Sequence, residues 1–119
     1  MSIPILEIDK FLVVSIQTEL TDSIVLRLQK DLAARINFRD IYGVVIDLTA
    51  VDLIDSFISR TLADISRITT LMGAKTIVTG IQPAIAITLV DMCIPLDSIC
   101  TALNLQEGID KLRLSQKEV

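Results

Sequence analysis

The sequence predicts a single α/β domain: a mixed β-sheet of about five strands with about four α-helices packed against it. A chain of 119 residues is long enough for one domain and too short for two. Its residues are 51% apolar but only 3% aromatic, so the core is aliphatic, which is typical of parallel strands covered by helices. Short β-rich runs also alternate with stretches whose apolar residues recur every three or four positions.

The N-terminal part predicts two strands and a helix, followed by a central strand. Residues 5–10 and 11–17 each form a β-rich run, and no helix fits between them, so we expect an antiparallel pair. Side chains of Thr21–Ser23 are suited to cap a helix over about 22–37. The apolar run at 42–48, which contains Asp47 near its end, predicts a buried central strand.

The middle of the chain predicts a loop and two further helices. An acidic loop over 49–55 leads into a helix over 56–72, and Gly73 suits the end of that helix. A strand is expected at 75–79, and Pro83 suits the first position of the helix that follows it. This short helix, 84–92, is apolar nearly all round, which favours contact with another subunit over simple burial.

The C-terminal part predicts a short strand and a helix. The strand lies within 96–102, around Ile99, and the helix spans 105–114. We expect the domain to occupy residues 1–115 and residues 116–119 to form a frayed tail.

Composition argues against several classes of function. The net charge of −4 opposes nucleic-acid binding, and the absence of histidine removes the commonest general base and metal ligand. Cys93 and Cys100 form no metal-binding motif, so we expect both to be reduced, buried and apolar in role, and we expect no metal or cofactor. No apolar run approaches the roughly 20 residues of a membrane span, and no signal peptide is evident, so a cytoplasmic protein is expected.

The segment from Val44 to Ser59 is the main candidate for a functional site. A buried strand leads into an acidic loop that delivers Asp55 and Ser56 to the start of a helix, where free N–H groups accommodate a phosphate. Either residue could instead serve only as the helix cap. Asp47, Asp52 and Asp55 could together suggest a magnesium site. A receiver domain of two-component signalling would also place an Asp at the end of its middle strand, but it needs an acidic pair after its first strand, and this sequence has none there.

A second candidate lies in the turn at residues 80–83, between a strand and a helix. Nucleotide-binding loops occur at such places, but this turn has a single glycine and no lysine. A simple turn is the main interpretation, and binding of a nucleotide or small ligand remains the alternative.

Over nearly its whole length the chain resembles the STAS family, the SpoIIAA-like fold of anti-sigma-factor antagonists, and most of all its RsbS-like stressosome subgroup. The segments that carry the resemblance are Ile3–Leu6, Val14–Gln17, Gly43–Thr49, Val51–Asp52, Ile54–Ile58, Leu71–Lys75 and Thr79–Ala84. Members carry a phosphorylatable serine or threonine after an Asp at the start of the second helix, which corresponds to Ser56. Ser59 is a secondary candidate one turn along.

The resemblance implies a non-enzymatic regulator of the bacterial stress response. Such a scaffold would form homo- and hetero-oligomers with RsbR-type STAS paralogues, sequester an RsbT-type serine kinase, release it on phosphorylation, and be reset by a phosphatase. The alternative is an antagonist that binds an anti-sigma kinase directly, although Phe57 and Ile58 replace the small residue and glycine usual there. The candidate partner-binding residues are Asp47, Asp52, Asp55, Ser56, Phe57 and Gln82.

Overall fold

The computed structural model describes residues 3–92 and 99–117, and within them it shows four helices and one five-stranded sheet. The elements are β1 (Leu6–Ile8), β2 (Phe11–Ser15), α1 (Asp22–Phe38), β3 (Gly43–Asp47), α2 (Ser56–Leu71), β4 (Lys75–Thr79), α3 (Pro83–Asp91), β5 (Cys100–Ala102) and α4 (Leu105–Lys117). The predicted α/β class and element order are confirmed.

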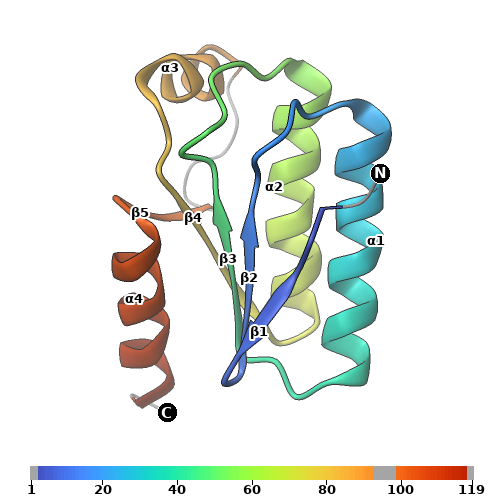
Figure 1. The fold of residues 1–119 in the computed structure, drawn as a ribbon, viewed down its shortest axis with the longest axis vertical. Helices are drawn as coiled ribbons and strands as arrows, with labels where there is room; N and C mark the ends of the chain where they lie inside the picture. Colours follow the sequence, from blue (N-terminus) through green and yellow to red (C-terminus); the bar gives the residue numbers. More distant parts are fainter. Residues whose placement is uncertain (1–2, 93–98, 118–119) are drawn as a thin grey trace.

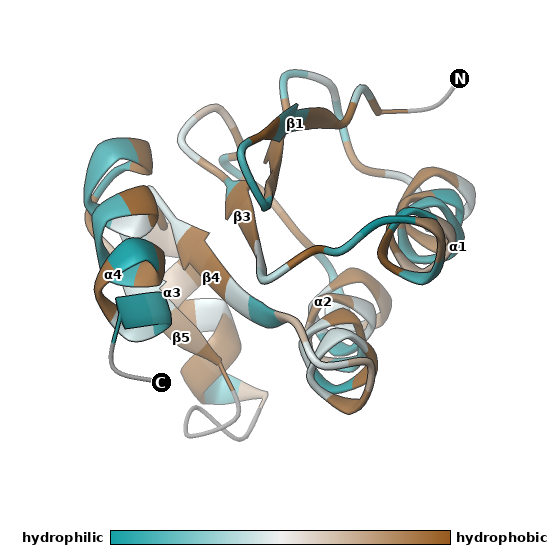
Figure 2. Ribbon diagram, turned by 90° about the horizontal axis from the view of Figure 1, so that it is seen from below, coloured by the Kyte–Doolittle hydropathy of each residue, from teal (hydrophilic) through white to brown (hydrophobic). Residues whose placement is uncertain are grey.

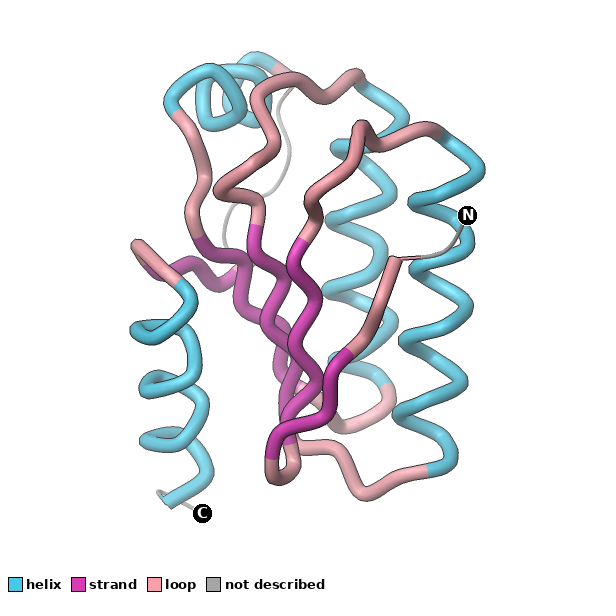
Figure 3. Tube along the Cα trace, in the orientation of Figure 1, coloured by secondary structure: helices cyan, strands magenta, loops and turns pink. Residues whose placement is uncertain are grey.

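The sheet is mixed and its strands lie in chain order. β1 pairs antiparallel with β2, and β2, β3, β4 and β5 then pair in parallel. Helices α1 and α2 lie side by side on one face of the sheet, α4 lies on the other, and α3 sits beyond one end of the strands (Figure 1). Because β2, β3 and β4 run the same way, the loops that follow them meet at that same end (Figure 3).

Each face of the sheet has its own apolar core. The larger core fills the space between the sheet and helices α1 and α2, and it includes Leu12, Val14 and Ile46. The smaller one lies under α4; its buried members are Phe11, Val45, Ile77 and Leu112. Figure 2 shows the central strands as hydrophobic ribbons between these helices. Burial on both faces explains why the run at 43–47 is almost continuously apolar.

Local signals explain where the helices begin. The Thr21 side chain accepts a hydrogen bond from the Ile24 amide (3.3 Å) and caps α1, as the sequence predicts. Pro83 occupies the first turn of α3, where its missing N–H removes no helical hydrogen bond. Gly73, at φ +87°, follows the end of α2 in the left-handed conformation that favours glycine.

Several expected boundaries differ from the structure. β1 is short because Asp9, at φ +55°, begins the turn into β2. The last helix runs to Lys117, beyond the expected 105–114, so Gln116 and Lys117 lie in a helix and not in the expected tail. Two contacts tie this last stretch to the body of the domain: Lys75 Nζ donates to Ser115 Oγ (3.3 Å), and Arg113 pairs with Asp9 (3.1 Å).

The cysteine prediction is partly wrong. Cys100 is exposed, because it lies in the three-residue edge strand β5. Cys93 lies outside the described residues. In the portion of the chain that the structure describes, no helix is both long and apolar enough to cross a membrane.

Candidate functional site

Ser56 is the first residue of α2, and its side chain is exposed. The helix cap is its neighbour: the Asp55 carboxylate accepts a hydrogen bond from the Ile58 amide (2.8 Å). The Ser56 hydroxyl makes no hydrogen bond to any residue in the described ranges 3–92 and 99–117. Capping is therefore the role of Asp55, and it does not occupy the exposed Ser56 hydroxyl.

Ser59, the secondary candidate, lies three residues after Ser56 in the first turn of α2. It is fully buried, and its hydroxyl donates to the backbone carbonyl of Asp55 (2.8 Å). A kinase has no access to a hydroxyl that is enclosed and engaged in this way. The structure therefore disfavours Ser59 as a second target and assigns it a role in fixing the first turn of α2.

A partner-binding residue is expected on the exposed loop, but Asp47 does not lie there. It ends β3 and is only 9% exposed. Its Oδ1 accepts two hydrogen bonds, from the hydroxyls of Thr49 (2.9 Å) and Thr79 (2.8 Å). In the structure Asp47 therefore ties the ends of β3 and β4 together, and its role in partner binding stays a prediction. Thr49 and Thr79 were not among the expected site residues.

Gln82 also has a structural contact that the sequence did not reveal. Its side-chain amide donates to the Thr49 carbonyl (2.7 Å), which joins the loop after β4 to the loop after β3. The two loops also approach closely at Gly80, at φ +69°, where a Cβ would overlap the Thr49 hydroxyl. Gln82 is half-buried, so its main visible role is to hold the two loops together.

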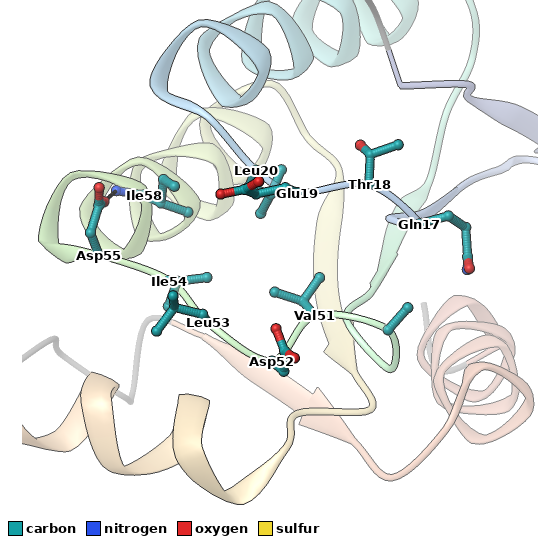
Figure 4. A pocket seen from close by; sticks show the side chains of 11 residues that line it. Gln17, Thr18, Glu19, Leu20, Val51, Asp52, Leu53, Ile54, Asp55 and Ile58 are labelled. Carbon is teal, nitrogen blue, oxygen red and sulfur yellow. Dashed lines mark hydrogen bonds between the residues drawn. The ribbon is translucent and has the colours of Figure 1, made fainter.

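A shallow pocket of about 430 Å³ lies beside the start of α2, between the loop after β2 and the loop after β3 (Figure 4). Its acidic members are Glu19, Asp52 and Asp55, and none of the described residues that line it is basic. Glu19 was missed because it is far from the other two in sequence. The pocket wall is completed by apolar side chains of Leu20, Val51, Ile54 and Ile58.

Exposed apolar side chains occur in the same stretch of chain, one in the pocket and one just after it in sequence. Leu53, which lines it, is 78% exposed, and Phe57, next to Ser56, is 40% exposed. A surface that combines negative charge with apolar side chains suits a protein partner that presents basic and apolar groups. In the described residues no group of three or more His, Cys, Asp or Glu is arranged to hold a metal ion.

Comparison with known proteins identifies the family. The STAS domain model matches residues 2–108. The chain belongs to the STAS family. It is 41% identical to RsbS of Moorella thermoacetica, in a variant with a serine-to-glutamate substitution, over 97% of both chains with a TM-score of 0.86. It is 42% identical to a chain from a structure of the stressosome, over 95% of this chain and 98% of that one, with a TM-score of 0.83.

A further relative is the RsbT co-antagonist protein RsbRA of Bacillus subtilis. It is 38% identical over 66 residues, which are 56% of this chain but only 24% of RsbRA. The likeness to phosphorylated SpoIIAA of Bacillus, at 14% identity and a TM-score of 0.70, shows the fold alone. The resemblance to the STAS family and its RsbS-like subgroup is thus confirmed.

Proposed function

We propose that this chain is a non-enzymatic, cytoplasmic subunit of a stressosome-type assembly that holds an RsbT-type serine kinase until Ser56 is phosphorylated. The observation that carries the proposal is the Ser56 hydroxyl: exposed, without a partner, and beside an acidic and apolar surface. The identity to RsbS and to a stressosome chain supports the scaffold role. The name of RsbRA, an RsbT co-antagonist, supports the choice of kinase.

Phosphorylation would act by adding charge where the surface is already negative. A phosphoserine carries about −1.5 to −2 charges at neutral pH. It would follow directly after Asp55, next to the pocket that Glu19 and Asp52 also line, so a partner docked there would have to desolvate the added negative charge together with these carboxylates. A loss of about 3 kcal/mol weakens binding roughly a hundredfold, which is enough for release. A phosphatase would then restore binding.

Assembly with RsbR-type paralogues and with further copies of the chain requires a second surface. Helix α3 is a candidate, because Ile87 is 62% exposed and Val90 is 60% exposed. The groove beside it, lined by Ala86, Leu89, Val90 and Leu103 among others, is largely apolar. Exposed apolar side chains next to a groove are typical of subunit contacts.

The release mechanism is tested by kinase retention on immobilised chain. Ser56→Ala should keep the kinase bound in the presence of ATP, whereas Ser56→Asp should weaken retention by at least about tenfold. Ser23→Asp is a matched control, because Ser23 is an exposed serine in the first turn of α1, at the same end of the sheet. Equal retention by all three variants and wild type would refute the proposal.

Mass spectrometry after incubation with the kinase and ATP tests the target directly. We expect phosphate on Ser56 and none on Ser59 or Ser23.

Two alternative functions can each be tested by a separate binding measurement. Tighter binding of an anti-sigma kinase than of an RsbT-type kinase would favour a direct antagonist. Calorimetric binding of a nucleotide, lost on substitution of Gln82, would favour a ligand-binding domain.

A further inference from the structure

Four side chains form a row along the exposed face of α2. The first is an uncharged serine and the other three are charged. Ser56, Arg60, Asp64 and Arg67 follow one another at spacings of four, four and three residues, so they lie on one stripe of the helix. All four are exposed. Arg67 Nη1 donates to Asp64 Oδ1 (2.9 Å), which closes the far end of the row as an ion pair.

Arg60 is the unpaired cation in this row. Within residues 3–92 and 99–117 its guanidinium makes no ion pair and no hydrogen bond. The acid next to it in the row, Asp64, is already engaged by Arg67. The side of Arg60 that faces the helix start therefore offers free hydrogen-bond donors.

Helix geometry directs Arg60 toward Ser56. Side chains on an α-helix lean toward its N-terminus, so a long side chain at position 60 covers the surface of the turn that contains position 56. An acid four residues before a base is also the favourable order for an ion pair on a helix. A phosphate on Ser56 would supply that acid.

Other charged groups near the start of α2 would repel a phosphate. Glu19, Asp52 and Asp55 come from the adjoining loops, and Asp22 opens the neighbouring helix α1. Arg60 is the basic residue of α2 closest in sequence to this negative region. It is therefore the group best placed to hold the added charge on the domain.

We propose that Arg60 is the internal partner of phosphorylated Ser56 and folds the phosphate back onto the surface of α2. This inference rests on the proposed phosphorylation of Ser56. The pair would complete an alternating row of charges along the helix. One modification would thus add negative charge to the docking surface and engage the free cation beside it.

The test is a phosphorus NMR titration of a chain into which phosphoserine is installed at position 56 during translation. Arg60 favours the dianion, so Arg60→Gln should raise the pKa of the second phosphate ionisation by about 0.3 unit, or about twofold in the ionisation constant. Arg60→Lys keeps the charge and should keep most of the wild-type value. Arg67→Gln, farther along the same row, should raise the pKa clearly less than Arg60→Gln does, although it releases Asp64.

A pKa that is the same in wild type and Arg60→Gln would overturn the inference, as would an equal shift in Arg67→Gln. Neither result would affect the proposed kinase switch, because the phosphate is installed without the kinase. Conversely, if the kinase fails to modify Ser56, the proposed function fails while the titration still measures the coupling. Unfolding of the unphosphorylated Arg60→Gln chain should match wild type, which confirms that the variant acts through the phosphate.

Discussion

Replacing Thr79 with valine tests whether Asp47 is held inside the domain as a structural residue. Thr79 is fully buried, and its hydroxyl donates to Asp47 Oδ1 over 2.8 Å. Valine keeps the shape of threonine but removes this donor. Asp47 is only 9% exposed, so little water can replace the lost bond, although Thr49 still donates. Hydrogen bonds to charged groups contribute about 1.5–3 kcal/mol, and we expect a loss of about 2 kcal/mol.

Urea unfolding followed by circular dichroism measures this loss. For a domain of this size, a change of about 2 kcal/mol lowers the melting temperature by roughly 8 °C. Thr88→Val is the matched control, because the Thr88 hydroxyl donates only to the Ala84 carbonyl within α3, near the surface. We expect that variant to lie within about 0.5 kcal/mol of wild type.

The refuting result is a Thr79→Val variant as stable as the control. It would mean that the hydrogen bond from the Thr79 hydroxyl contributes little to stability and that the Asp47 carboxylate has other sufficient hydrogen-bond partners. The role of Asp47 as a partner-binding residue, which its burial now argues against, would then be open again.

Two other predictions concern the loops and the assembly. Gly80→Ala should destabilise the domain by at least about 1 kcal/mol more than Gly73→Ala in urea unfolding: both glycines have positive φ, but only at Gly80 would a Cβ meet other atoms, those of Thr49 and Asp47. Equal losses would show that the loops after β3 and β4 separate at little cost. Ile87→Glu should prevent assembly with STAS paralogues in analytical ultracentrifugation while leaving the melting temperature of the single chain unchanged, whereas Leu71→Glu, at the exposed end of α2, should do neither. Normal assembly of Ile87→Glu would exclude α3 as the contact.

The helices were predictable from sequence because their signals are local. Thr21 and Pro83 mark helix starts by chemistry that acts within three or four residues, and the apolar spacing between these marks is regular. The short strand β5 was harder to place, because a three-residue edge strand has little periodicity of its own.

The candidate site was only partly predictable, because burial depends on residues distant in sequence. Asp47 and Asp52 look alike in the sequence, yet one is enclosed by Thr79, which lies 32 residues away, while the other is exposed. The pocket beside Ser56 is completed by Glu19 from the loop after β2. Spacing along the chain reveals neither relationship, although polar residues at the ends of adjacent parallel strands are a signal worth testing.

The division of roles between Asp55 and Ser56 bears on how the proposed switch would work. The first turn of α2 is fixed by the Asp55 carboxylate on the Ile58 amide and by the Ser59 hydroxyl on the Asp55 carbonyl. Neither bond uses the Ser56 hydroxyl, so a phosphate there leaves both in place. If Ser56 were the cap, phosphorylation would disturb the start of α2 and would act by changing the local fold. With Asp55 as the cap, the effect of phosphorylation is confined to the charge of the surface. A partner then has to contact this surface directly to respond to the phosphate.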